Sequence, residues 1–149
     1  MGRIVGRIVE WFSLEEMMNQ LSEEDIVLEI TPEVREHAEM MNSLRIWAVF
    51  IFPVIFRLGL IVSSWYRTVA FNASIGGASN SAHLDGRATD INNIDTTNEI
   101  LVQAFIVAWQ VICSIHHKIG GVEVYDWGMH FDSFSDKFGY TEFRTKDNR

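Results

Sequence analysis

A histidine and an aspartate lie seven positions apart in the stretch "SAHLDGRATD", with a glycine between them. The Asp85-Gly86 dipeptide is a strong signal for a two-residue hairpin turn, in which both central residues need a positive φ. A hairpin centred there would place His83 and Asp90 on one face as diagonal neighbours, roughly 7 Å apart. An imidazole nitrogen and a carboxylate oxygen at that separation can bind one metal ion. The stretch therefore predicts two ligands of a metal site.

His130 is the candidate for a third ligand. A catalytic zinc site usually has three protein ligands and one open position for water. In "GMHFDS", a strand would direct Met129 and Phe131 towards the core. Because side chains alternate across a strand, His130 and Asp132 would then share the opposite face. The spacing favours His130 as a ligand without deciding it.

The other histidines fit structural positions better. His37 lies in "PEVREHAEMM", whose many charges indicate a solvated helix face. His116 and His117 follow a long apolar stretch, at the expected end of a helix, where a cation complements the helix dipole. None of these three is expected to bind the metal.

Composition and charge are those of one globular domain. The 149 residues are 48% hydrophobic and 21% charged, and the formal net charge is −8. The negative charge argues against nucleic acid as a partner, because phosphate binding requires a basic surface. The one candidate for a membrane span, residues 46–56, is about half as long as a bilayer requires, and Pro53 interrupts it. Cys113 is the single cysteine, so an internal disulfide is excluded, and its apolar neighbours indicate a buried thiol.

Capping signals predict two helices in the first half of the chain. The "SLEE" stretch from residue 13 is a capping box, which marks the start of the first helix. Thr31, followed by a proline and an acid, marks the start of the second. The second helix should extend to about residue 52, because Pro53 cannot continue it.

A third helix and several short strands follow. Asp95 or Thr96 is the expected cap of a helix over residues 97–116. The segments "LIVSS", "VEVYDW" and "MHFDSF", together with the 81–91 hairpin, have the composition of strands. Helices packed on a small, mainly antiparallel sheet make an α+β domain.

These stretches together resemble the M15 family of zinc peptidases, which act on bacterial cell walls. "LIVSSWYRTVAFNASIGGASNSAHLDGRATDI" follows the family pattern of a strand, Ser-x-Tyr-Arg, Asn, Gly-Gly and Ser-x-His-x-x-Gly-x-Ala-x-Asp. "YDWGMHFD" resembles the segment with the last histidine, and "FSLEEM" and "TPEVREHAEMMNSL" resemble the opening helices. The resemblance implies the hedgehog/D-Ala-D-Ala peptidase-like fold, with residues 12–149 as one peptidase domain and residues 1–11 as an N-terminal extension.

The resemblance also assigns roles to individual residues. His83, Asp90 and His130 match the three Zn²⁺ ligands of the family. Arg67 matches the arginine that binds and polarises the carbonyl or carboxylate of the substrate, and Ser81 matches a serine that contacts the peptide beside the metal. Zinc is therefore the implied cofactor.

The general base is where this chain departs from the family. Many members carry a Glu or Asp three residues before the last histidine, where this chain has Trp127. Asp126, one position earlier, is our first hypothesis for the catalytic base, with Glu123 and Asp132 as alternatives. Asp132 also fits a second role, because on the strand face of His130 it could hydrogen-bond that ligand and orient it.

The implied function is a zinc-dependent metalloprotease that hydrolyses a bond next to a D-residue in the peptidoglycan stem peptide. Family members are D-Ala-D-Ala carboxypeptidases or L-alanyl-D-glutamate endopeptidases used as phage endolysins, and the residues do not choose between these two types. The chain shows no clear export signal. We therefore expect a monomer made in the bacterial cytoplasm, which a holin releases to the wall or a virion carries there.

Two other classes of function stay open. The first is a zinc-bearing binding domain without catalysis, as in hedgehog-type signalling domains, because the catalytic acid is displaced by one position. The second is a structural protein without a metal, in which His83 and Asp90 are only the polar face of a hairpin.

Overall fold

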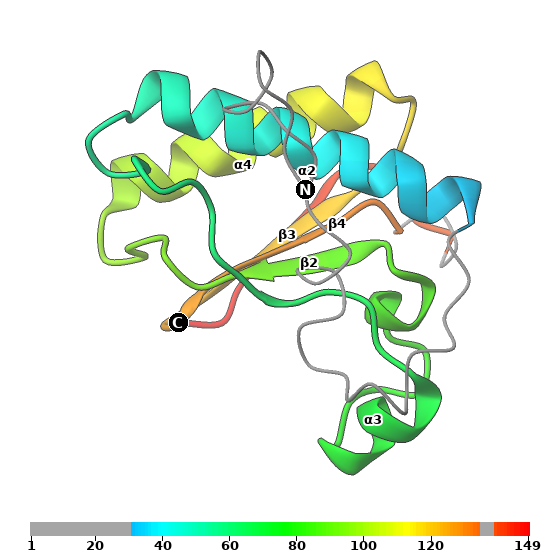
Figure 1. Cartoon of the computed structure of the whole chain (residues 1–149). Helices are drawn as coiled ribbons and strands as arrows, with labels where there is room; N and C mark the ends of the chain where they lie inside the picture. The colour runs from blue at the N-terminus through cyan, green and yellow to red at the C-terminus, as the bar shows by residue number, and fades with distance from the viewer. Residues whose placement is uncertain (1–30, 135–138) are drawn as a thin grey trace.

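The computed structural model describes residues 31–134 and 139–149, which form an α+β domain (Figure 1). Its helices are α2 (Pro32–Ile51), α3 (Val69–Ser74) and α4 (Glu99–Ile115), with a short 3-10 helix η3 (Ala82–Asp85). Its strands are β1 (Val62–Ser64), β2 (Ala88–Ile91), β3 (Gly121–Tyr125), β4 (Gly128–Asp132) and β5 (Arg144–Asp147). The predicted fold class is confirmed. The 1–11 extension, and the helix expected after the capping box at residue 13, lie outside the described residues.

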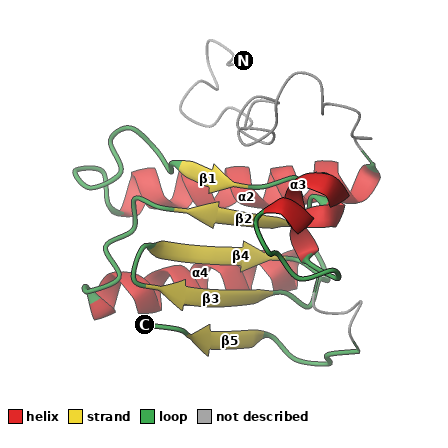
Figure 2. Cartoon of the chain, turned by 90° about the horizontal axis from the view of Figure 1, so that it is seen from below, coloured by secondary structure: helices red, strands yellow, loops and turns green. Residues whose placement is uncertain are grey.

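The five strands form one open sheet in the order β1-β2-β4-β3-β5 (Figure 2). All neighbours are antiparallel except β3 and β5, which are parallel. The segments predicted as "VEVYDW" and "MHFDSF" are β3 and β4, joined by a two-residue turn. The strand order places β2 beside β4, so that Asp90 and His130, 40 residues apart in the chain, face each other in register.

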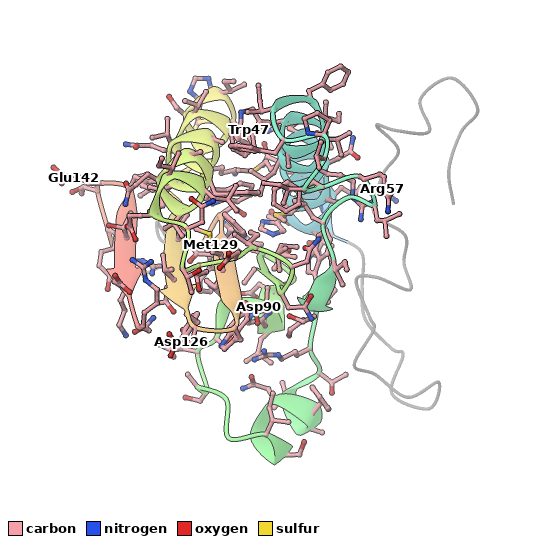
Figure 3. The ribbon with its side chains drawn as sticks, turned by 90° about the vertical axis from the view of Figure 1, so that its left-hand side faces the viewer. Trp47, Arg57, Asp90, Asp126, Met129 and Glu142 are labelled. Carbon is pink, nitrogen blue, oxygen red and sulfur yellow. The ribbon has the colours of Figure 1, made fainter. Side chains whose placement is uncertain are left out.

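Helices α2 and α4 lie side by side on one face of the sheet (Figures 1 and 3). Met129 and Phe131 of β4 are fully buried in the core on this side, as the alternation along their segment predicted. The ring of Phe131 contacts the rings of Phe105 and Trp109 of α4, with centroids 6.0 and 5.6 Å apart. His130 therefore points to the opposite face, which these two helices do not cover.

Helix α2 begins and ends where the capping signals predicted. The Thr31 side chain accepts a hydrogen bond from the backbone N–H of Val34 (3.3 Å), and the following proline occupies the first turn. The helix ends at Ile51, two residues before Pro53, whose ring cannot continue a helix. Local sequence signals are sufficient to predict the two ends of α2, because a capping side chain and a proline ring each act on neighbouring residues of the chain.

The apolar segments of the chain contribute to the core. Within the stretch 46–56, Ala48 and Phe56 are fully buried, whereas Phe50, Ile51, Val54 and Ile55 are more than half exposed. Cys113 is a free thiol that is only 1% exposed, which confirms the predicted buried cysteine. No helix in the described part of the chain combines the length and apolarity needed to cross a membrane.

The predicted cap of α4 is wrong. Asn98, rather than Asp95 or Thr96, caps the helix, and its side chain accepts from the backbone N–H three residues later (3.1 Å). Asp95 accepts from the backbone N–H two residues later (3.0 Å) and so closes a turn that precedes the helix. The Thr96 hydroxyl donates to the carbonyl of Tyr125 (2.7 Å). Because both side chains are engaged elsewhere, the helix begins only at Glu99.

The predicted hairpin across Asp85-Gly86 is also wrong. The segment before the glycine forms η3, and only Gly86 has a left-handed φ (65°), whereas the predicted turn needs two such residues. Ser81 favours the 3-10 helix because its side chain accepts from the backbone N–H of His83 (3.3 Å). Strand β2 pairs with β1 and β4 instead. His83 thus approaches Asp90 from a 3-10 helix and not from a neighbouring strand.

His37 is fully buried, contrary to the prediction of a solvated histidine. Its Nδ1 is 2.8 Å from Ser133 Oγ and its Nε2 is 2.9 Å from Thr89 Oγ1, so it links α2 to β2 and to the residue after β4. The rings of Trp65 and Trp109 contact it edge-on. Burial lowers its pKa to about 3. The local sequence could not indicate this position, because the two hydroxyl partners are 96 and 52 residues away in the chain.

We expect the buried, neutral His37 to make the free energy of unfolding of the metal-free protein fall on acidification. The unfolded state binds a proton below about pH 6.5, whereas the folded state does not until about pH 3. Between pH 6.5 and pH 5 the wild type should therefore lose roughly 2 kcal/mol more than His37→Gln, whose amide does not titrate. Urea unfolding at both pH values measures the difference. Equal losses in the two proteins would show that His37 is not the responsible group.

Candidate metal centre

Three side chains, His83, Asp90 and His130, form one cluster. One ligand atom of each lies within 4.8 Å of the others. Asp90 lies on the face of the sheet away from α2 and α4 (Figure 3). Asp90 is central, with Oδ2 3.3 Å from His83 Nε2 and Oδ1 2.7 Å from His130 Nδ1. The β2–β4 register pairs Asp90 with His130, and η3 adds His83. The structure thus brings together the three residues that the sequence proposed as ligands.

Hydrogen bonds determine which imidazole nitrogens face the centre. Nδ1 of His83 is 2.6 Å from the backbone oxygen of Trp65, and because a carbonyl only accepts, this nitrogen carries the proton. Nε2 of His83 therefore presents its lone pair towards Asp90. Nε2 of His130 lies 3.3 Å from Asp132 Oδ2, which leaves Nδ1 on the side of Asp90. Outer hydrogen bonds of this kind orient the histidines of metal sites.

The electrostatics of the centre favour a positive charge. Burial opposes ionisation of Asp90, but its hydrogen bonds with His130 and His83 outweigh burial and hold the pKa of Asp90 well below its usual value. Burial also opposes a charge on His130, yet the contacts with Asp132 and Asp90 raise its pKa to about 10. Burial lowers the pKa of His83. Two imidazoles and a carboxylate around a position that attracts a cation suit Zn²⁺, which is bound by nitrogen and oxygen ligands of these types.

The centre lies in the wall of a cleft of about 640 Å³. Side chains that precede α3 and η3 line one part of the cleft, and side chains of β3, β4, β5 and the β3–β4 turn line another. The lining residues that matter below are Arg67, Asn80, Ser81, Glu123, Tyr125, Trp127, Asp132, Arg144 and Lys146. The cleft is therefore rich in charged and aromatic groups, with the candidate metal ligands among them.

Arg67 and Ser81 lie beside the three candidate ligands. Nη2 of Arg67 is 3.6 Å from Asp90 Oδ2, and its Nε donates to Ser64 Oγ (3.0 Å), which holds the guanidinium at the cleft. Ser81 Oγ accepts from the backbone N–H of His83 and thereby also shapes η3. Both residues line the cleft, where a substrate could reach them.

Asn72 and Gly77 of the motif support Arg67. Oδ1 of Asn72 accepts from Nη1 of Arg67 (3.4 Å), and Nδ2 of Asn72 donates to the backbone oxygen of Ala78 (2.8 Å). Gly77 leaves room for this side chain, because a Cβ at position 77 would lie 2.1 Å from Asn72 Oδ1. The buried amide of Asn72 in α3, anchored to the segment that follows this helix, therefore holds the arginine in place.

The three acids considered as the general base occupy different places. Asp126 is exposed in the turn between β3 and β4 (Figure 3), and the described residues that line the cleft do not include it. Glu123 does line the cleft and is opposite His130 in the β3–β4 register. Asp132 is 1% exposed, and its carboxylate lies 3.3 Å from His130 Nε2. That contact is the one expected of a residue that orients a ligand.

Arg144 of β5 joins two of these acids, and the sequence analysis missed it. Its Nη1 is 3.3 Å from Glu123 Oε1, and its Nη2 donates to Asp132 Oδ2. The other oxygen of Glu123 accepts from the Tyr125 hydroxyl (2.5 Å). Gly121 makes room for the guanidinium, since a Cβ there would lie 2.8 Å from Arg144 Cζ. No local motif could have indicated Arg144, because it reaches the cleft through the parallel pairing of β5 with β3.

His116 and His117 follow the last turn of α4, as predicted, and lie outside the three-residue centre. Nδ1 of His116 is 3.3 Å from Oε2 of Glu36. Lys118 contacts the other oxygen of the same carboxylate (3.0 Å). These side chains therefore join the segment after α4 to α2.

Comparison with known proteins places the chain in a family. The profile of the Peptidase M15 family matches residues 11–116, which is most of the chain. The match includes Arg67, Ser81, His83 and Asp90, and His130 follows it in the chain. A search of curated proteins found no match. M15 peptidases are zinc-dependent metallopeptidases, and the centre described above has donors suited to that metal. The matched profile and the site geometry together show that this chain belongs to the Peptidase M15 family.

Proposed function

We propose that the protein hydrolyses a peptide bond next to a D-residue in the stem peptides of bacterial peptidoglycan. The observation that carries this proposal is the arrangement of His83, Asp90 and His130 in the wall of a cleft, with both imidazoles oriented by outer hydrogen bonds. These three residues are the proposed zinc ligands. Zinc held there would polarise the scissile carbonyl and lower the pKa of a water molecule towards about 7.

Glu123 is the general base that we propose. It lies across from His130 on the neighbouring strand and inside the cleft, whereas Asp126 is exposed in the turn. Arg144 and Tyr125 each hold one oxygen of the Glu123 carboxylate, and each oxygen keeps a further lone pair. Glu123 would take a proton from the attacking water and return it to the leaving amine.

Arg67 and Ser81 are proposed to bind the substrate. The Arg67 guanidinium, next to Asp90, would donate hydrogen bonds to the carbonyl oxygen that gains negative charge in the transition state. Ser81, at the start of η3, would hold the peptide beside the centre. Asp132 would orient His130 through its contact with Nε2 and would not touch the substrate.

The wider role that we propose is lysis of the bacterial wall. The proposed enzyme has one peptidase domain, residues 12–149, after an extension of residues 1–11; the family match over residues 11–116 supports the first part of this domain. The enzyme would act as a monomer, as an endolysin released by a holin or as a virion-borne hydrolase of a bacteriophage. Mass spectrometry of digested muropeptides separates the two reaction types, because a carboxypeptidase releases free D-alanine and an L-alanyl-D-glutamate endopeptidase releases a peptide that begins with D-glutamate.

Replacing any one of the proposed ligands with alanine should remove zinc and activity together. A centre with two protein ligands holds the ion far more weakly, so His83→Ala, Asp90→Ala and His130→Ala should contain little zinc by elemental analysis. His116→Ala, outside the centre, is the control and should keep the wild-type content. A variant with stoichiometric zinc and full turnover would exclude its residue as a ligand. Wild-type protein with bound zinc and no turnover would favour the binding-domain alternative.

Glu123→Gln should lower kcat by about 10²-fold or more without loss of zinc, because the amide cannot take up the proton of the water. Asp126→Asn is the matched control, since it makes the same chemical change in the exposed turn, and we expect nearly wild-type kcat. Steady-state kinetics on muropeptides, with zinc measured in each variant, test the assignment. An inactive Asp126→Asn beside an active Glu123→Gln would move the general base to Asp126.

Arg144→Gln should weaken zinc binding by about tenfold or more and lower kcat, because it removes the cation shared by Asp132 and Glu123. Arg144→Lys should recover only part of the loss, since a point charge replaces the guanidinium fork poorly. Competition with a chelator measures the affinity. Arg149→Gln is the control, because it removes a cation of the same terminal segment that pairs with exposed acids. Unchanged affinity in Arg144→Gln would contradict this role.

A further inference from the structure

Trp127, in the turn at one end of the cleft, has no role in the chemistry proposed above. Its ring is stacked on that of Tyr125, with centroids 4.8 Å apart and planes inclined by 16°, and both residues line the cleft. Trp127 is nevertheless 45% exposed. Figure 2 shows the β3–β4 turn at the end of the sheet opposite α3, which Arg67 precedes in the chain. The aromatic pair therefore belongs to the turn end of the cleft, whereas the chain segment that carries Arg67 enters it from the α3 end.

The hairpin of β3 and β4 holds this aromatic pair in place. Tyr125 is opposite Gly128 in the β3–β4 register, so no β4 side chain stands directly across from its ring. Position 128 requires glycine, because a Cβ there would lie 2.1 Å from the backbone oxygen of Ile91. The Tyr125 hydroxyl donates to Glu123 (2.5 Å), which fixes the ring against which Trp127 stacks. The stacked surface is thus already formed in the protein without a ligand.

The surroundings of the pair suit a ligand with one apolar face and a polar edge. The face of an indole ring carries partial negative charge and attracts weakly positive C–H groups. Lys146 and Asn80 line the same cleft and can bind hydroxyl or amide groups. A wholly apolar ligand would cover the Lys146 ammonium and the Asn80 amide without offering either a hydrogen bond. The net charge of −8 disfavours a nucleotide, so a pyranose ring fits best.

We propose that Tyr125 and Trp127 form a saccharide subsite, which binds a sugar ring of the glycan strand that carries the stem peptide. This inference rests on the proposed peptidase function, because the sugar and the scissile bond then belong to one substrate. Tyr125 and Glu123 are two residues apart on β3, about 7 Å. A sugar at Trp127 would therefore lie within one or two substrate residues of the proposed base, as cleavage of the L-alanyl-D-glutamate bond requires and cleavage of the terminal D-Ala-D-Ala bond does not. The substrate class is the glycan-linked stem peptide rather than the free peptide.

Kinetics on two soluble substrates test the subsite: a disaccharide-linked stem peptide and the same peptide without its sugars. The zinc-loaded wild type should prefer the sugar-linked substrate about tenfold in kcat/KM, through a lower KM, which is the scale of one aromatic contact. Trp127→Ala and Trp127→Leu should reduce this preference to about one, whereas Trp127→Phe should keep most of it. Zinc content and the midpoint of thermal unfolding are measured for every variant, so that only folded, loaded enzymes are compared.

The possible outcomes separate the subsite from the function on which it rests. A wild type that cleaves both substrates equally well, or a preference that persists in Trp127→Ala, would overturn the subsite and leave the peptidase function intact. A preference retained by Trp127→Leu would indicate a general apolar contact instead of ring stacking and would overturn it too. A wild type that cleaves neither substrate would refute the proposed function, and the saccharide subsite with it.

Discussion

The contact between Asp90 and His130 across two neighbouring strands is the interaction on which the rest of the centre depends. It exists only if β2 and β4 pair in a single register, and the core behind the sheet enforces that register. A slip of one residue would turn His130 towards the helices and expose Phe131, which is fully buried against Trp109. His37 reinforces the same alignment from the helix side. The apolar packing thus holds the candidate ligands in position from the opposite face.

A series of alternating charges extends from this contact to the edge of the sheet. The imidazole of His130 lies next to the Asp132 carboxylate, Arg144 contacts that carboxylate, and Glu123 contacts the same guanidinium. Each buried or half-buried charge has an opposite neighbour, which is the condition under which a protein tolerates charges away from water. Strand β5 is therefore part of the site and not only an edge of the sheet. Its parallel pairing with β3 supplies Arg144, a cation that contacts both acids.

The segment around His83 shows how a motif can be informative although its predicted geometry is wrong. The hairpin expected across Asp85-Gly86 is absent, and a 3-10 helix occupies its place. In that helix Ser81 is the cap and Gly86 is the left-handed residue that ends it. A Cβ at Gly86 would also lie 2.8 Å from Val34 of α2. The serine, histidine and glycine of the family motif are therefore explained by one compact turn that delivers His83 to Asp90.

The sequence by itself determined the features that depend on neighbouring peptides. Thr31 and Pro53 bound α2, and the alternation along β4 separates the core-facing side chains from His130 and Asp132. The family motif named the candidate ligands. Only the tertiary structure decided that His37 is buried and that β5 brings Arg144 to the cleft. It also decided that Glu123 of β3 lines the cleft, whereas Asp126 of the β3–β4 turn does not. A cap or a pleat is set by adjacent residues, whereas these contacts depend on which strands pair and in which register, and no local spacing encodes that choice.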